Sequence, residues 1–316
     1  MVRSASIINF KGGVSKTTLT LHLACYLAKT SRVLVIDVDH QSSLSIVVMG
    51  QRLWEKQVAA GMTVNRIFQS FVNRKVSMPG DEIIVKNVFH QRNGSSNLYP
   101  SLDFVSAQFE LDDTEIDLAS TTYGIAALSD WEKRTLIASW LDSINASQKY
   151  DYVLFDCPPA TKIVSQNALI ASDCYIVPVI PDELSSRGVT HFQSLVSKKI
   201  DEKLIYLRNV AQVPAGEVPA AYREKTAMAA IVPSLIKTAG NAASGMTNIH
   251  TEQLAALRSR WGNSVTQEVG RHYIGVPEAI NAGWPVWNFW GGNAKLKVKS
   301  MMTSICTELK NRIDSV

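Results

Sequence analysis

The sequence predicts an α/β fold in which a mostly parallel, twisted sheet carries helices on both faces. Short apolar strands alternate with longer segments of helical periodicity along most of the chain. The strands are hydrophobic almost throughout, which is typical of parallel strands that are buried on both faces. Because parallel neighbours need a crossover connection, this alternation favours a parallel sheet over an antiparallel one.

The first strand is expected at Ser6 to Phe10. Glycines follow it at once, and residues 17–29 then place Leu19, Leu23 and Leu27 at helical spacing. Strand, glycine-rich turn and helix form the beginning of a βαβ unit. Further strands are expected at residues 32–38, 152–155, 174–180 and 227–232, with helices at residues 131–144, 184–207 and 251–261.

The composition is that of an ordinary globular chain with a sizeable core. Of 316 residues, 46% are hydrophobic and 19% are charged. A formal net charge of +4 is too small to indicate nucleic-acid binding by itself. The four cysteines have no paired spacing, so neither a disulfide framework nor a zinc site is expected. Neither a signal peptide nor a membrane span is apparent, and a cytoplasmic location is expected.

Two stretches fit the alternation poorly. Residues 75–130 have weak periodicity and an acidic second half, and residues 208–226 contain Pro214, Gly216 and Pro219. We interpret the first as an insertion at the sheet edge and the second as a loop, because neither resembles a linker between domains. A single domain over residues 1–316 is therefore expected.

The loop at residues 11–18 reads Lys-Gly-Gly-Val-Ser-Lys-Thr-Thr. Backbone N–H groups at a helix N-terminus attract anions, and Gly12 and Gly13 let the chain curl around a phosphate. Lys16 can then reach the β- and γ-phosphates, and the Thr17 hydroxyl can ligate Mg²⁺. The alternative is a turn that binds nothing. The predicted nucleotide-binding residues of this loop are Gly12, Gly13, Val14, Ser15, Lys16, Thr17 and Thr18.

Carboxylates follow two of the expected strands. Asp37 and Asp39 end the second strand on one face, where an open α/β sheet carries its ligands. Carboxylates there can orient an attacking water or hold Mg²⁺ through water, although two solvated acids would give the same pattern. Asp156 ends an apolar strand before Pro158 and Pro159, and it can accept from a Mg²⁺-bound water.

The loop departs from the common pattern G-x-x-x-x-G-K-[ST], since Phe10 and Ser15 occupy its glycine positions. It resembles instead the deviant Walker A box of the ParA/MinD family of P-loop ATPases. The segment from Asp37 is similar to the family's D-x-D-P-Q, with His40 in place of proline. Residues 150–159 resemble its Y-D-x-x-x-x-D-x-P-P, and residues 167–179 and 276–286 resemble two later segments.

The resemblance implies slow ATP hydrolysis by a homodimer that holds ATP at its interface. Lys11 would reach the partner subunit's nucleotide, and Lys11, Lys16 and Asp39 would be catalytic, with Asp39 positioning the water. Thr17, Asp37 and Asp156 would serve Mg²⁺. Adenine contacts are expected near Pro233 and at residues 271–274, which begin with Arg271. Most members have glycine at the position of Ser15.

The resemblance also implies partners. No helix-turn-helix domain is expected ahead of the loop, so nonspecific DNA binding is expected in place of operator binding, with nucleoid association and a ParB-like or cargo-adaptor protein. Such binding depends on phosphate contacts from Lys and Arg, although a solvated surface explains any single one equally well. The candidates are Lys198, Lys199, Lys203, Arg258, Arg260, Lys295, Lys297 and Lys299.

Two alternatives remain at this stage. A MinD-like membrane-associated ATPase needs an amphipathic C-terminal helix, and an apolar stripe at residues 298–313 has that spacing. Such a stripe is more often explained by core packing, and membrane binding is not expected. A metal-cluster enzyme of the same fold would need paired cysteines at a dimer interface, and the cysteine spacings offer no matching pair.

Overall fold

A six-stranded sheet forms the centre of the computed structural model, which describes residues 2–94, 98–182, 185–238, 245–291 and 295–316. The strand order is β3-β2-β4-β1-β5-β6, and every pairing between these strands is parallel. The predicted fold class is therefore confirmed. The strands are β1 (Arg3–Ile7), β2 (Val33–Asp37), β3 (Leu102–Val105), β4 (Tyr152–Asp156), β5 (Cys174–Val179) and β6 (Ala227–Pro233).

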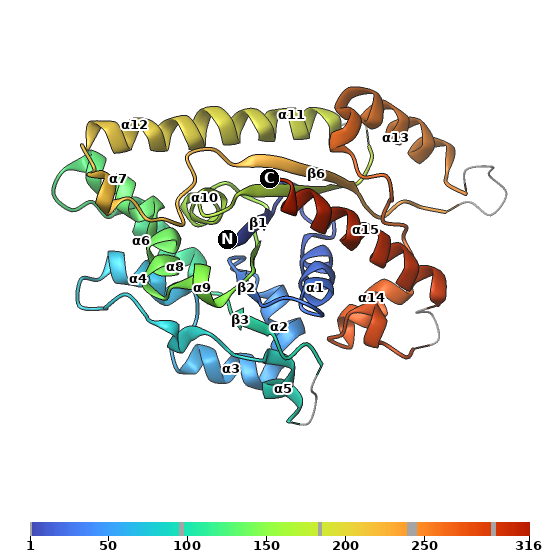
Figure 1. The fold of residues 1–316 in the computed structure, drawn as a ribbon, viewed down its shortest axis with the longest axis horizontal. Helices are drawn as coiled ribbons and strands as arrows, with labels where there is room; N and C mark the ends of the chain where they lie inside the picture. Colours follow the sequence, from blue (N-terminus) through green and yellow to red (C-terminus); the bar gives the residue numbers. More distant parts are fainter. Residues whose placement is uncertain (1, 95–97, 183–184, 239–244, 292–294) are drawn as a thin grey trace.

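Helices cover both faces of the sheet (Figure 1). Side chains alternate along each strand, so Val35 and Leu154 face one buried cluster while Ile36 and Phe155 face the other. The first cluster includes α1 (Lys16–Leu27), α2 (Ser43–Met49), α5 (Val88–Asn93), α14 (Gly275–Asn281) and α15 (Leu296–Asp314). The second includes α4 (Asn65–Val72), α6 (Leu111–Ser120), α7 (Ala126–Arg134), α8 (Leu136–Ser143), α10 (Ile163–Ile170) and α12 (Glu202–Val210).

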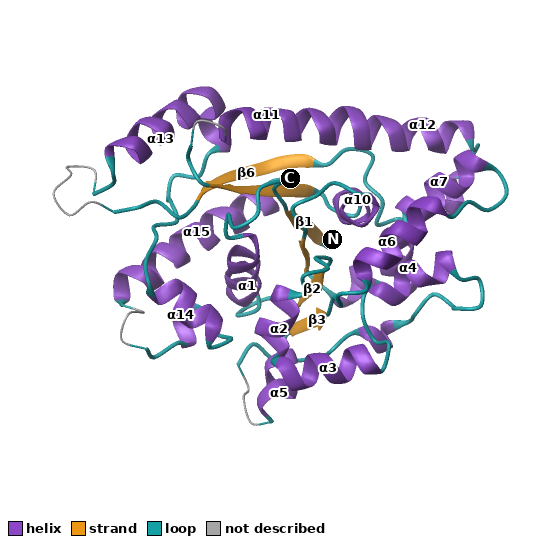
Figure 2. Ribbon diagram, turned by 180° about the vertical axis from the view of Figure 1, so that it is seen from behind, coloured by secondary structure: helices purple, strands orange, loops and turns teal. Residues whose placement is uncertain are grey.

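A long helical rod lies along one edge of the molecule. Figure 2 shows α11 (Ser185–Leu195) and α12 as one long rod, joined through the π-helical turn η2 (Val196–Asp201), with α13 (Asn248–Trp261) beside its beginning. The helix expected over residues 184–207 is this rod, although residue 184 lies outside the described residues. Two short helices, α3 (Gln51–Ala59) and α9 (Ala146–Lys149), complete the set.

Three elements differ from the sequence-based expectation. The first strand, expected at Ser6 to Phe10, is β1 at Arg3–Ile7, and the residues after Ile7 already belong to the loop that leads to α1. The stretch at residues 75–130 contributes β3, a four-residue edge strand that pairs with β2. So short a strand gives too few residues for a periodic signal. The helix expected over residues 131–144 is two helices, because the chain bends at Thr135 between α7 and α8.

The apolar stripe of the C-terminal helix is part of the core. Val298, Met302, Ile305, Leu309 and Ile313 are all buried, and α15 packs on α1 and on the sheet. This packing supports the core interpretation of the stripe over the MinD-like one. None of the helices in the described ranges combines the length and the apolar character that crossing a membrane requires.

Candidate functional site

The strand register brings the predicted acids together. β4 lies between β1 and β2, and Asp37 pairs directly with Asp156 across the sheet. The loop after Ile7 leads from the neighbouring end of β1 into α1. Because these strands are parallel, their carboxyl ends form one edge, and the loop and both acids meet there.

The loop at residues 11–18 curls before α1. Gly13 has a φ of 69° and Ser15 a φ of 73°, both in the left-handed region. A Cβ added at Gly12 or Gly13 would meet no atom within 4 Å, so these glycines border open space. The first turn of α1 carries no acidic side chain, which leaves its N–H groups and its positive dipole end suited to an anion.

Neighbouring groups hold this loop in place. The Asn9 amide donates to the Pro178 carbonyl at 2.7 Å, and its oxygen accepts from the Lys11 N–H at 3.1 Å. Lys16 is almost fully buried, and its Nζ donates to the Lys11 carbonyl at 3.3 Å. Burial lowers the pKa of Lys16, against the attraction of Asp156 and Asp39. The ammonium group is thus aimed into the loop.

Asp156 lies at the foot of the loop. The Thr17 and Thr20 hydroxyls donate to its two carboxylate oxygens, each at 2.8 Å. Burial raises the pKa of Asp156 to about 7, although both hydroxyls act in the opposite direction. A hydroxyl and a carboxylate side by side form an oxygen donor set of the kind that Mg²⁺ prefers. A cation would also stabilise the ionised form of this carboxylate.

Asp37 is fully buried and serves as an anchor. One of its oxygens accepts from the Ser45 N–H and hydroxyl at 2.9 and 2.7 Å, and the other accepts from the Asp39 N–H at 3.0 Å. Burial, and then the charge of Asp156, raise the pKa of Asp37. Asp39 accepts from the Gln41 N–H at 3.0 Å and lies closer to the surface. The arrangement fixes the Asp39 backbone beside the loop.

A cavity of about 400 Å³ opens in front of the loop, lined by Gly12, Gly13, Ser15, Lys16, Thr17, Thr18 and Asp39. It gathers all the predicted loop residues except Val14, which is buried. Asp37 and Asp156 lie behind it, and Asp156 is connected to it through Thr17. The cavity suits a triphosphate, since a lysine, the loop and helix N-terminus with their backbone donors, and the Asp39 carboxylate line it.

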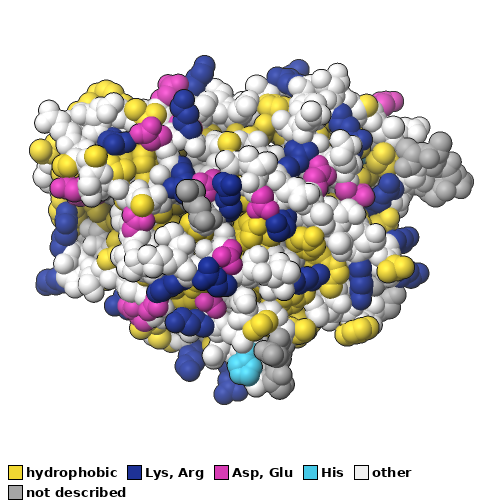
Figure 3. Space-filling model, in the orientation of Figure 1, with side chains coloured by type: hydrophobic (Ala, Val, Ile, Leu, Met, Phe, Trp, Pro, Cys, Tyr) yellow, Lys and Arg dark blue, Asp and Glu magenta, His cyan; other side chains and the backbone are white. Residues whose placement is uncertain are grey.

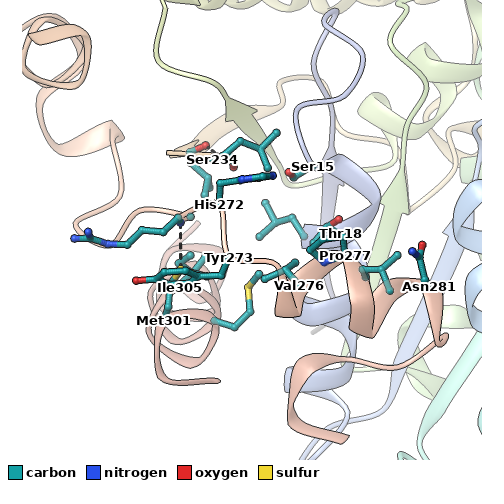
Figure 4. Close-up of a pocket in the computed structure, with 17 residues that line it drawn as sticks. Ser15, Thr18, Ser234, His272, Tyr273, Val276, Pro277, Asn281, Met301 and Ile305 are labelled. Atoms are coloured by element: carbon teal, nitrogen blue, oxygen red, sulfur yellow. Dashed lines mark hydrogen bonds between the residues drawn. The ribbon is translucent and has the colours of Figure 1, made fainter. Parts of the chain in front are cut away.

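A second, more apolar cavity of about 200 Å³ adjoins the first (Figure 4). Ser15, Thr18 and Ile280 line both, so a ligand can extend from one into the other. In Figure 4, Tyr273, Val276 and Met301 lie together along one side, with Ser15, Ser234 and His272 grouped above them. An apolar slot with a few polar groups suits the base of a nucleotide.

The predicted base contacts lie in this region. Arg271 lines the cavity, and its N–H lies 3.2 Å from the Met301 sulfur. Pro233 is not among the lining residues, but its carbonyl accepts from Gly270, which is, at 2.7 Å. Val276, Pro277, Met301 and Ile305 were not predicted as base contacts, because only the tertiary packing of α14 and α15 brings them here.

Two further residues connect α14 to the site. The His22 Nε2 accepts from the Val286 N–H at 3.1 Å, so its Nδ1 carries the proton and donates to the Thr18 carbonyl at 2.6 Å. Burial lowers the pKa of His22 to about 4. The Arg92 guanidinium donates to the carbonyls of Ala282 and Gly283 at 3.0 and 2.6 Å. The sequence carries no local signal for either residue.

Lys11 points out of the loop. Its side chain is about half exposed, and it forms an ion pair with Asp182 of the same chain. An exposed pair of this kind contributes at most about 1 kcal/mol, so Lys11 can exchange Asp182 for another anion. The structure therefore leaves Lys11 at the rim of the site and not inside it.

The candidate DNA-binding residues lie on η2, α12, α13 and α15. Lys198 and Lys199 are exposed on η2, and Arg260 is exposed near the end of α13. Lys203 pairs with Asp130 at 2.9 Å, and Arg258 donates to the Gln267 carbonyl at 2.8 Å. Lys295 is exposed at the beginning of α15, while Lys297 and Lys299 lie over the rings of Tyr273 and Trp290.

This combination of a parallel sheet, a glycine-containing loop at the start of α1 and acids at the strand ends defines a P-loop NTPase fold. The chain matches the AAA domain family over residues 2–208. It belongs to the ParA/MinD-type ATPases, and specifically to the ParA-like partition and positioning ATPases.

Individual relatives agree with this assignment. The chain is 29% identical over 198 residues to the chromosome partitioning protein ParA of Caulobacter vibrioides, a match that covers 62% of this chain and 63% of that one. It is 27% identical over 209 residues to the sporulation initiation inhibitor protein Soj of Bacillus subtilis, with 65% and 70% covered. The alignments thus span roughly two thirds of each relative's length.

Solved structures share the fold over nearly the whole chain. Apo McdA of Cyanothece has a TM-score of 0.66 at 15% identity, with 99% of both chains covered. A plasmid partition protein of Borrelia burgdorferi bound to AMPPNP has a TM-score of 0.60 at 18% identity, with 98% and 100% covered. At such identities these structures support the fold alone.

Proposed function

We propose that this chain is a Mg²⁺-dependent ATPase that dimerises on ATP, binds nonspecific DNA and positions a cargo through a partner protein. The observation that carries the proposal is the convergence of Lys16, Thr17, Asp39 and Asp156 around one phosphate-sized cavity. The names of the relatives support partition or positioning as the biological role. The acids fit Mg²⁺ because the donors are all oxygen.

Each residue has a defined task in this reaction. Lys16 and the α1 N–H groups bind the β- and γ-phosphate oxygens, and Lys16 offsets the charge that builds on them. Thr17 and Asp156 would hold Mg²⁺, which when bound neutralises phosphate charge. Asp39 orients a water for in-line attack on the γ-phosphorus, and the bond to the bridging oxygen breaks as ADP leaves. His22 fixes the Thr18 end of the loop.

Dimerisation assigns a role to Lys11. Since its contact with Asp182 is exposed and weak, the proposal has Lys11 leave Asp182 and bind the phosphates held by the partner subunit. Two sites would then be completed together, each by a lysine from the other chain. Hydrolysis removes the γ-phosphate that both chains contact, so it would also release the dimer.

Size-exclusion chromatography combined with an ATPase assay tests this proposal. The wild type should elute as a dimer with ATP or a nonhydrolysable analogue, and as a monomer without nucleotide. Lys11→Ala should bind nucleotide yet remain monomeric. Asp39→Ala should dimerise on ATP but lose hydrolysis by about 10²-fold or more, as for loss of a water-orienting group. Normal hydrolysis by Asp39→Ala would overturn the assigned role of this carboxylate.

A further inference from the structure

One face of α6 is exposed, apolar and acidic. Phe109 and Ile116 are large hydrophobic side chains that are 55% and 60% exposed. Asp113 and Asp117 are exposed on the same helix, and spacings of three and four residues place Ile116 and Asp117 on the same side of α6 as Asp113, while Phe109 lies in the turn just before the helix. We call Phe109, Asp113, Ile116 and Asp117 the α6 face.

The charge of this region restricts what can cover the face. Residues 101–125 contain six Asp or Glu and no Lys, Arg or His, in a chain whose net charge is +4. The neighbouring Lys162 is paired with Asp112 at 3.2 Å and lies 3.9 Å from Glu115. The negative charge would repel nucleic acid and anionic lipid. A protein segment that carries Lys or Arg beside apolar side chains would match both the negative charge and the exposed apolar side chains of the face.

A first chain of contacts leads from the α6 face to the acids of the site. The Phe109 ring meets Trp54 edge to face, with ring centroids 5.1 Å apart. The Trp54 indole donates to the Ala107 carbonyl at 2.9 Å, and the Ala107 N–H donates to the Ser45 hydroxyl at 2.9 Å. That hydroxyl donates in turn to Asp37 at 2.7 Å. Asp37 holds the Asp39 backbone, so the path ends at the water-orienting carboxylate.

A second path leads to the loop after β4. Glu115 lies on the inner side of α6, and its carboxylate accepts from the Val164 N–H at 2.8 Å. Val164 is in the first turn of α10, shortly after Asp156 and the two prolines. Lys162, just before α10, pairs with Asp112 of α6. α6 is therefore connected directly to the segment between β4 and α10, which follows Asp156.

We infer that the α6 face is the docking surface through which a cationic, amphipathic protein segment stimulates hydrolysis. This inference rests on the proposed function, because it names where the partner of the ATPase binds. Docking would bury Phe109 and Ile116 and neutralise the acids beside them. It would also fix Trp54 and α6, and through them the positions of Asp39 and of the loop after Asp156.

A binding experiment tests the surface independently of catalysis. The probe is a labelled 18-residue amphipathic peptide of Leu, Lys and Arg, with a Leu and Glu peptide as its charge control, measured by fluorescence anisotropy. The double variant Asp113→Lys with Ile116→Ser should bind the cationic peptide about tenfold or more weakly. The matched control is Ile249→Ser with Glu252→Lys on α13, which alters an equally exposed apolar–acidic pair and should bind as the wild type does.

Stimulation of ATPase activity tests the connection to the site. The cationic peptide should raise kcat of the wild type and of the α13 control several-fold. The α6 double variant should keep its basal rate without stimulation. Trp54→Leu should still bind the peptide but respond less, because the path through Ala107 and Ser45 begins at its indole. Circular dichroism confirms that each variant is folded.

The outcomes separate this inference from the proposed function. Suppose that the chain dimerises and hydrolyses ATP, but the peptide binds the wild type and the α6 variant equally, or binds neither. The assignment of the docking surface to α6 is then wrong. If the α6 double variant fails to dimerise on ATP, the face is a contact between copies, and the inference is also wrong. If hydrolysis is absent while peptide binding still depends on α6, the proposed function fails and the surface stands.

Discussion

Ser15 adopts a backbone conformation that glycine adopts more easily than other residues. Its φ of 73° is left-handed, which costs a residue with a Cβ about 1–2 kcal/mol. Ser15→Gly removes this strain but adds unfolded-state freedom of about 0.4–1 kcal/mol. We expect a net gain of about 0.5–1 kcal/mol in the free energy of unfolding, measured by urea denaturation. Ser15→Ala keeps the Cβ and should give no gain, so equal stabilities for the Gly and Ala variants would contradict this account.

Asp201 introduces a pH dependence of stability. It is buried in η2 with one oxygen that has no partner among the described residues, and burial raises its pKa to about 7. The folded state therefore binds this proton more tightly than the unfolded state, whose pKa is about 3.9. The contribution of Asp201 to stability is fully present below pH 4 and is lost as the pH rises through 7.

Asp201→Asn should remove this dependence. Because the amide carries no charge, we expect the variant to exceed the wild type by about 1–3 kcal/mol at pH 8, the usual cost of an unsatisfied buried polar group. The difference should shrink or reverse at pH 4. Urea unfolding at both pH values measures it. A variant that is equally destabilised at both pH values would show that Asp201 has a packing role instead.

The residues of the site were predictable to the extent that they belong to local motifs. Lys16, Thr17, Asp37 and Asp156 follow strands within short segments, and parallel strands bring such segments together at one edge. His22 is close to the loop in sequence, but its role depends on its contact with Val286, and Arg92 and Met301 reach the end of α14 and the apolar cavity from distant positions. Their contributions arise from tertiary packing, which single-sequence patterns do not contain.

At the scale of elements, α15 offers a direct comparison of core and surface. Leu309 is fully buried against α1, while Leu296 at the beginning of the same helix is 83% exposed. Leu309→Ala should lower the free energy of unfolding by about 2–5 kcal/mol, since it leaves a cavity. Leu296→Ala should change it by less than about 0.5 kcal/mol. Equal, small effects at both positions would mean that α15 is not docked in solution.

The helices and strands that could be predicted from the sequence are again those with a local sequence signal. β2, β4, β5 and β6 are predictable because each is a nearly continuous apolar run. β1 (Arg3–Ile7) contains an arginine and two serines, so the apolar pattern places the first strand at Ser6 to Phe10, three residues too late. β3 escapes prediction because four residues at a sheet edge show no period, and the break at Thr135 escapes it because both α7 and α8 continue the same helical spacing. Topology follows from the alternation of strands and helices, whereas the boundary between two helices depends on tertiary contacts.

At the scale of the whole molecule, the nucleotide site joins the two ends of the chain. The base cavity is lined by the loop before α1, the end of β6, α14 and α15. Arg3 donates to the Asp314 carbonyl at 3.0 Å, so α15 is also fastened to β1. A nucleotide that extends through both cavities would therefore contact segments near both ends of the chain.

The surface proposed to bind DNA also belongs to the scale of the whole molecule. Figure 3 shows Lys and Arg scattered among Asp and Glu on the face it displays, so a few cations must carry any DNA contact made there. Lys198 and Lys199 are exposed together on the long rod of α11, η2 and α12, which forms one edge of the molecule in Figure 1. Lys56 on α3, at the opposite edge, provides a control.

We expect ATP-dependent binding to random duplex DNA that weakens steeply with salt. Converting Lys198 and Lys199 to Ala should weaken binding at low salt, and the slope of log K against log salt should fall by about 0.9 for each DNA phosphate that the variant no longer neutralises. Lys56→Ala should match the wild type. Gel shifts over a series of salt concentrations, with and without ATP, measure both quantities. Because every variant must still dimerise on ATP, weaker binding by a dimeric variant assigns the effect to the DNA-binding surface itself. Unchanged slopes would place that surface on another element, and binding without ATP dependence would contradict the proposed cycle.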